Sequence, residues 1–254
     1  MNATEAELQE TIYNSRNLTR RWLHQSRKCW VDNAIERVSF RGMLACEIGP
    51  GSCIYLPKLE KNASQLYVTD IENQHLTVAF SFSKKSEKVV VLEDDITASK
   101  LPENFFDLIL FSEVIEHIPN ASLVLNNIVR KLKVGGILIL STPQKYSFIE
   151  LACKIAFMPI VIDLVRKIYR EPILETGHIN LLTEREMRKH FANQGLLVVE
   201  AYKCGLYIPI LSEFFGKFAV KVQKYLEDKV KHTPLSHILW TQCYILKKNE
   251  IHTD

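Results

Sequence analysis

Short apolar runs alternate with helix-length segments from residue 43 to residue 141, and this alternation constrains the fold most. Five of these runs have the length and composition of strands: Met43–Ile48, Gln65–Thr69, Val89–Leu92, Phe106–Phe111 and Gly136–Ser141. Residues 122–132, between the last two, carry apolar side chains at helical spacing. Repeated strand–helix units predict a parallel, doubly wound α/β sheet.

The regions on either side of this alternation predict additions to the core. Residues 196–202 and 238–246 read as two more strands, separated by a long helical stretch at 211–230. Two closing strands joined in this way predict an antiparallel edge, which gives a mostly parallel, Rossmann-like seven-stranded sheet. We expect a helical cap at 1–40 and one domain at 41–254. Within that domain we expect a lid insertion at about 144–176 and an amphipathic helical insertion at about 207–232.

Composition excludes several classes of protein. The 32 basic and 29 acidic side chains leave a net charge of +3, too mild to indicate nucleic-acid binding by itself. The polar N-terminus does not resemble a signal peptide, and the apolar run at 155–162 is far shorter than the ~20 residues of a spanning helix. None of the six cysteines forms a Cys-x-x-Cys pair. We therefore expect a cytoplasmic protein with reduced thiols.

The sequence Glu47-Ile-Gly-Pro-Gly51 joins the first strand to the next helix. Its glycines allow a ligand to approach the backbone closely. A dinucleotide fingerprint would have a third glycine at position 54, which is Ile, and Glu47 would repel a pyrophosphate. Both features favour a cationic ligand. Asp70 ends the second strand, where a carboxylate can accept ribose hydroxyls, and Asp95 follows the third, near where an adenine amino group would lie.

At these motifs the chain resembles the class I S-adenosylmethionine (SAM)-dependent methyltransferases. The resemblance covers residues 44–201 and rests on the glycine turn, Val68-Thr-Asp70, Asp94-Asp95-Ile96, residues 106–117, Gly135–Pro143 and Gly177–Thr183. It implies that Glu47, Gly49 and Gly51 line the methionine end of SAM, with Asp70 on the ribose and Ile71 on the adenine. It also implies that Asp95 and Ile96 frame the adenine edge, while Ser112 and Glu113 lie beside the sulfonium. Cys53 departs from the family, which usually has glycine there.

The segment Ser112-Glu113-Val-Ile-Glu116-His117 carries the candidate acceptor chemistry. On a helix, Glu113, Glu116 and His117 would share one face, and His178 lies in a later family stretch. With His178 they could hold a divalent metal (Mg, Mn, Fe or Zn) that lowers the pKa of an acceptor hydroxyl. Alternatively, His117 or His178 is a metal-free general base, with Glu116 assisting, or these residues only shape the pocket. The pattern is similar to that of ubiquinone-pathway O-methyltransferases and of small-RNA 3′-end 2′-O-methyltransferases.

The insertions favour a hydrophobic substrate. An apolar stripe runs from Leu211 to Leu226, with Lys217, Lys221 and Lys224 elsewhere on the helix. It either packs on the sheet as a lid or also touches a membrane, which would make the protein peripheral. The leading hypothesis is methyl transfer from SAM to a small, lipophilic acceptor, most simply a hydroxyl. RNA 2′-O-methylation and a non-catalytic SAM-binding subunit are the alternatives, and the oligomeric state stays open.

Overall fold

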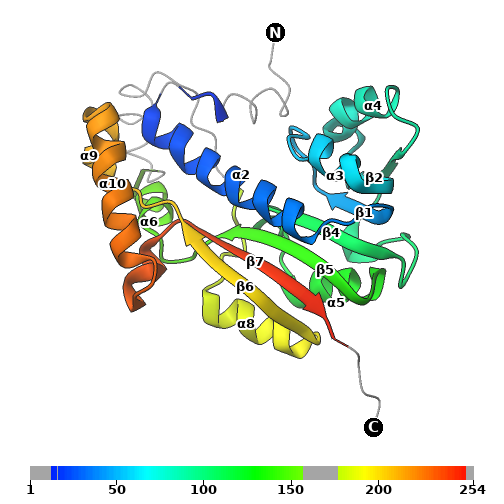
Figure 1. Cartoon of the computed structure of the whole chain (residues 1–254). Helices are drawn as coiled ribbons and strands as arrows, with labels where there is room; N and C mark the ends of the chain where they lie inside the picture. Colours follow the sequence, from blue (N-terminus) through cyan, green and yellow to red (C-terminus); the bar gives the residue numbers. More distant parts are fainter. Residues whose placement is uncertain (1–12, 16, 157–176, 250–254) are drawn as a thin grey trace.

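The computed structural model describes residues 13–15, 17–156 and 177–249, which form a single twisted sheet covered by helices on both faces (Figure 1). The seven strands lie in the order β3-β2-β1-β4-β5-β7-β6. Among them only β7 runs opposite to the other six. The strands are β1 (Met43–Ile48), β2 (Ala63–Asp70), β3 (Val89–Glu93), β4 (Phe106–Ser112), β5 (Leu132–Pro143), β6 (Leu196–Cys204) and β7 (Thr241–Lys248). The predicted mostly parallel, Rossmann-like sheet with an antiparallel closing strand is confirmed.

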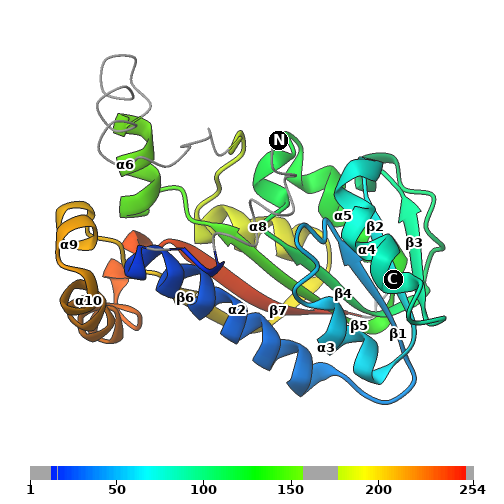
Figure 2. The ribbon, with the colours of Figure 1, turned by 90° about the horizontal axis from the view of Figure 1, so that it is seen from above.

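Helices cover the sheet from two sides, with α2 and α3 on one face and α5 and α8 on the other (Figure 2). The pleat of β1 explains the two cores: Met43 and Ala45 point into the first, and Cys46 and Ile48 into the second. The described helices are α2 (Leu18–Val38), α3 (Leu56–Asn62), α4 (Thr77–Ser83), α5 (Ala121–Lys131), α6 (Phe148–Ala156), α8 (Glu184–Asn193), α9 (Pro209–Phe214) and α10 (Gly216–Val230).

Local sequence signals set the ends of several helices. The Asn120 side chain accepts from the backbone N–H of Leu123 at the start of α5. Thr183 and Glu186 form a reciprocal capping box at the start of α8. Caps of this kind satisfy backbone N–H groups that have no partner within the helix.

The connections reverse direction between β1 and β4, which are hydrogen-bonded neighbours in the centre of the sheet. In open α/β sheets, ligands bind in the crevice at the carboxyl ends of the strands beside such a reversal. The glycine turn after β1 and the Ser112–His117 segment after β4 therefore meet at one place.

One helix prediction and one strand prediction needed correction. The helix predicted at 211–230 is two helices, α9 and α10, because Gly216 has a φ of +46° and breaks the path between them. The closing strand begins at Thr241 rather than at Ile238, which ends a 3-10 turn. The predicted cap over residues 1–12 and most of the predicted lid, residues 157–176, lie outside the described residues. Among the described helices, none is both long and apolar enough to cross a membrane.

Candidate functional site

The turn after β1 is shaped to admit a ligand against its backbone. Gly49, Gly51 and the non-glycine Cys53 all have positive φ angles, of +70°, +50° and +58°. A Cβ atom on Gly49 would lie 2.5 Å from Cγ2 of Val114, so no larger residue fits there without displacing the Val114 side chain. Cys53 adopts the backbone conformation for which the family favours glycine, and its buried thiol is accommodated.

Glu47 supplies a buried carboxylate beside this turn. The residue is 2% exposed, and its Oε2 has no hydrogen-bond partner within the described residues. Burial raises its pKa from an ordinary 4.5 to about 8. A buried acid that lacks a partner fits the ammonium group of SAM, which would supply the missing donor and the opposite charge.

The carboxyl ends of β2 and β3 place the residues predicted to bind the nucleoside. Asp70 ends β2, and its Oδ1 accepts from Nδ1 of His75 and from the Glu72 backbone N–H, each at 3.1 Å. Ile71 beyond it is 58% exposed, as an open surface for a flat ring would be. Asp95 caps a 3-10 turn by accepting from Thr97, while Ile96 is buried in the core. Their roles toward adenine stay predictions.

The end of β4 carries a hydrogen-bonded chain of polar side chains. The Ser112 and Ser141 hydroxyls lie 2.8 Å apart, and Ser141 donates to Oε1 of Glu113 at 2.8 Å. Glu113 has a φ of +59°, which ends the strand abruptly. Its Oε2 accepts from Nη1 of Arg27 at 2.6 Å, and both side chains are largely buried. The two residues are 86 positions apart, so this ion pair joins α2 to the segment after β4.

Arg27 is a site residue whose role the sequence analysis did not identify. Its Nη2 also contacts the Tyr13 hydroxyl at 3.1 Å, and its guanidinium lies 5.4 Å from the ring centroid of Trp240. His24 packs edge-on against both of these aromatic rings. Burial, followed by the charges of Arg27 and Arg20, lowers the pKa of His24 well below its ordinary value, so His24 is neutral at pH 7. The signal was an arginine in the buried stripe Leu23, Arg27, Trp30, Ala34 of α2.

Glu116, His117 and His178 form the potential metal-binding group. Each offers one ligand atom, and these atoms lie within 4.8 Å of one another. Thr142 donates to Oε2 of Glu116 at 3.0 Å, whereas the buried Oε1 of Glu116 has no hydrogen-bond partner among the described residues. Burial, followed by the charge of Glu113, raises the pKa of Glu116 well above its ordinary value. Nε2 of His117 lies 4.0 Å from Oε1 of Glu116, too far for a hydrogen bond, and a bound cation would supply the missing partner.

Both histidines are oriented by hydrogen bonds from their Nδ1 atoms. Nδ1 of His117 lies 3.1 Å from the Gly177 carbonyl oxygen, and Nδ1 of His178 lies 3.2 Å from Oε2 of Glu150. Because these oxygens accept, each Nδ1 carries a hydrogen, and in the neutral form of the ring Nε2 then carries the lone pair. Metal-binding histidines are commonly held by a carboxylate or carbonyl in this way. Glu150, which also accepts from Trp240 Nε1 at 3.2 Å, was missed because nothing in the sequence links it to residue 178.

The helix expected to carry Glu113, Glu116 and His117 on one face does not form. Glu113 belongs to the turn after β4, and a single 3-10 turn spans Ile115–His117. The structure consequently brings Glu116, His117 and His178 together but directs Glu113 to Arg27. Glu113 was also predicted as a metal ligand, and it is not part of this group.

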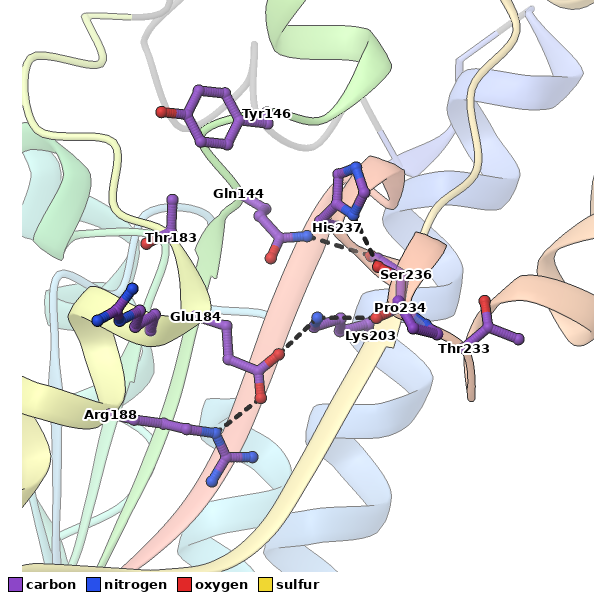
Figure 3. A pocket seen from close by; sticks show the side chains of 11 residues that line it. Gln144, Tyr146, Thr183, Glu184, Arg188, Lys203, Thr233, Pro234, Ser236 and His237 are labelled. Atoms are coloured by element: carbon purple, nitrogen blue, oxygen red, sulfur yellow. Dashed lines mark hydrogen bonds and ion pairs between the residues drawn. The ribbon is translucent and has the colours of Figure 1, made fainter.

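A second hollow of about 580 Å³ lies between α8, the end of β6 and the segment before β7 (Figure 3). At its centre Glu184 bonds Lys203 at 2.6 Å and Arg188 at 2.7 Å. None of the predicted site residues lines this hollow. Glu184 pairs with both inner cations, and nothing in the hollow indicates a particular ligand, so we assign none to it.

Comparisons with known proteins find similarity to methyltransferases. Residues 46–140 match the family model described as a methyltransferase domain. The chain is 29% identical over 126 residues to the ubiquinone biosynthesis O-methyltransferase of Pseudomonas fluorescens (strain SBW25), covering 47% of this chain and 53% of that protein. It is 27% identical over 180 residues to the corresponding protein of Pseudomonas aeruginosa (strain LESB58), covering 64% and 76%. The chain thus spans about half the length of the first of these curated relatives.

Solved structures show the same fold. A complex between the Haloferax volcanii Trm112 methyltransferase activator and a methyltransferase contains a chain that matches with a TM-score of 0.62 at 15% identity. The match covers 98% of this chain and 100% of that one. The family match, the strand order and the glycine turn with its buried acid agree with one another. The chain contains a class I SAM-dependent methyltransferase domain, with distant similarity to ubiquinone biosynthesis O-methyltransferases.

Proposed function

We propose that this protein transfers the methyl group of SAM to a hydroxyl of a small, lipophilic acceptor, with a divalent metal held by Glu116, His117 and His178. The proposal depends chiefly on one observation: two oriented imidazoles and an unpartnered buried carboxylate oxygen meet just after β4. The distant likeness to ubiquinone biosynthesis O-methyltransferases supports a hydroxyl acceptor. The aromatic rings of Tyr13 and Trp240 near Arg27 support an apolar one.

The residues of the crevice divide the work of such a reaction. When bound, SAM supplies a methyl group on a good leaving group, and a divalent cation lowers the pKa of a nearby hydroxyl. Glu47 and the glycine turn hold the amino acid end of SAM, and Asp70 holds its ribose. Glu116, His117 and His178 orient the acceptor oxygen, while α2 covers the corner and excludes water. Glu113 is held in place by Arg27 beside the predicted position of the sulfonium.

The acceptor class is tested with methyl-labelled SAM and the purified chain. The acceptors are a catechol with an alkyl tail, the same catechol with both oxygens already methylated, and an RNA oligomer with a 3′-terminal ribose. We expect label only in the first. Transfer to RNA alone would replace the proposed acceptor class, and SAM binding without transfer to any acceptor would indicate a non-catalytic subunit.

The metal is tested on the same reaction after dialysis against a chelator. We expect activity to fall and to return with one of Mg, Mn, Fe or Zn. The Glu116→Gln and His178→Asn variants should lose about 10²–10⁴-fold in rate, a typical contribution of an activating group. His237→Asn, which alters an exposed histidine outside the crevice, is the matched control. Full activity after chelation would exclude the metal and leave the general-base alternative.

A further inference from the structure

The helices α9 and α10 present large apolar side chains to solvent. Leu211 and Val222 of the predicted stripe are partly covered, but its aromatic residues are not. The exposed fractions are 73% for Ile210, 70% for Phe214, 53% for Phe215, 61% for Phe218 and 63% for Tyr225. We call these five residues, four of them aromatic and one (Ile210) aliphatic, the aromatic face. Clustered exposure of this kind marks a binding surface rather than the scattered apolar residues of an ordinary surface.

The aromatic face is separate from the side of α10 that packs on the protein. Ala219, Gln223 and Glu227, spaced four residues apart, are buried, and α10 contacts α2. Gln223 accepts from the Ile208 backbone N–H and Glu227 accepts from two further backbone N–H groups, which fixes the rotation of the helix. Phe218 and Tyr225 therefore cannot turn inward without breaking these bonds.

The charges around the aromatic face are mainly positive and favour an anionic partner. Lys217, Lys221 and Lys224 recur at helical spacing on α10 and are exposed. The acids of the two helices are engaged elsewhere: Glu213 bonds Tyr207 and Asn17, Glu227 is buried, and Asp228 pairs with Lys231. Aromatic side chains beside lysines are the composition of helices that lie in the headgroup region of an anionic bilayer.

The position of the face agrees with a lipophilic acceptor. Both views place α9 and α10 at one end of the molecule (Figures 1 and 2). There α9 contacts α6, which exposes Leu151 and carries Glu150, the residue that orients His178. A bilayer at this end would lie close to the acceptor side of the crevice.

We propose that the aromatic face of α9 and α10 docks this protein peripherally on an anionic lipid bilayer. The aromatic rings enter the boundary between headgroups and acyl chains, and the lysines contact anionic headgroups. Docking involves no covalent step and needs neither SAM nor acceptor, so it is measured separately from the proposed methyl transfer.

Co-sedimentation of the full chain with vesicles tests this docking. The two vesicle types are phosphatidylcholine alone and phosphatidylcholine with about one third phosphatidylglycerol, at low and high salt. We expect binding to the anionic vesicles that weakens as salt screens the lysines. Equal binding to both vesicle types, or no binding to either, would overturn the proposal.

Two double variants and a control locate the contact. Phe214→Ser with Phe218→Ser, and separately Lys217→Glu with Lys221→Glu, should each lower the partition coefficient at least about tenfold. All four side chains are exposed, so circular dichroism and thermal unfolding should match the parent. Leu197→Thr with Val199→Thr removes two exposed apolar side chains from the edge strand β6 and should bind like the parent. Loss of binding in this control alone would move the contact away from α9 and α10.

A second measurement separates a bilayer from a second copy of the chain. In a Phe218→Trp variant, lipids with brominated acyl chains should quench the new fluorescence above the background of the three native tryptophans. Light scattering without lipid should give the same mass for the parent and for the Phe214→Ser, Phe218→Ser variant. A parent dimer that this variant converts to monomer, without bromine quenching, would assign the face to self-association and overturn docking on lipid.

Discussion

The two sides of the crevice are constructed differently. On the β1 side, the residues predicted to hold SAM come from the turn and strand ends directly after β1 and β2, and backbone shape does most of the work. On the β4 side, Arg27, Glu113, Glu150 and His178 are brought together from distant segments by side-chain bonds. We therefore expect the β1 side to tolerate changes outside its own turn. The β4 side should depend on contacts between segments that are distant in the sequence.

Removing the guanidinium of Arg27 should have the largest effect on stability. The Arg27→Met variant leaves the carboxylate of Glu113 without its partner in a largely buried place and should cost about 3–5 kcal/mol of unfolding free energy. Urea denaturation measures this cost. Arg37→Met is the matched control, because its ion pair with Glu200 is half exposed and should contribute only about 0–1 kcal/mol.

Adding Glu113→Gln to Arg27→Met should recover part of the lost stability, since no charge is then left unpaired. SAM binding should weaken but persist in the double variant, because Glu113 is predicted to lie beside the sulfonium, while methyl transfer is lost. If SAM binding were lost as well, the two sides of the crevice would not be independent.

The converse change is Gly49→Ala on the β1 side. Its Cβ would lie 2.5 Å from Val114, and the backbone at Gly49 is left-handed. We therefore expect the unfolding free energy to fall by about 2–4 kcal/mol and SAM binding to be lost. Gly42→Ala has a φ of +88° but open space around it, so it isolates the backbone strain of about 1–2 kcal/mol. Adding Val114→Ala should relieve the overlap in Gly49→Ala. Calorimetry of metal binding should show no change in any of these variants.

The Glu150→Gln variant tests the β4 side at a residue that is predicted to orient His178 and not to bind the metal itself. Its amide can still accept from Trp240, but it no longer presents a carboxylate to His178. Metal affinity should fall about 10–100-fold, as is usual for residues that orient a metal ligand. Glu184→Gln, in the second hollow, should leave metal affinity unchanged. Equal losses in both variants would indicate a general electrostatic effect and would contradict a role for Glu150.

The smallest expected effect is a pH dependence of SAM binding. The unliganded protein keeps Glu47 protonated up to about pH 8, and a bound ammonium would favour its ionised form. SAM affinity should therefore rise by up to about tenfold from pH 7 to pH 8, and isothermal titration in two buffers should detect the released proton. A Glu47→Gln variant should bind more weakly and show no such rise.

The same group makes a prediction for the stability of the unliganded protein. The raised pKa means that the folded state keeps a proton that the unfolded chain loses near pH 4.5. The contribution of Glu47 to stability is therefore greatest below pH 4.5 and declines as pH rises toward 8. In thermal unfolding, the stability of Glu47→Gln should fall less than that of the parent as the pH rises from 4.5 to 8. An identical pH profile in both proteins would contradict the burial of Glu47.

The sequence was sufficient for the features that depend on neighbouring residues. The strands were recognisable from apolar runs that end in glycine or acid, and the turn at Glu47 from its own composition. Glu116 and His117 are adjacent, so their pairing was also predictable. The bonds from Arg27 to Glu113 and from Glu150 to His178 were not, because their spacing of 86 and 28 residues carries no periodic signal. The helix expected at Glu113 failed because the packing of β4 and Arg27 fixes a left-handed residue that no propensity would favour.

The bond between Arg27 and Glu113 also bears on where this protein can be cut. The family match begins at residue 46, and a boundary near residue 40 looks natural from the sequence. A chain shortened to that point would keep all seven strands yet lose the cation that pairs with Glu113. The helix that precedes the matched domain thus supplies one half of a buried ion pair whose other half lies in the candidate site.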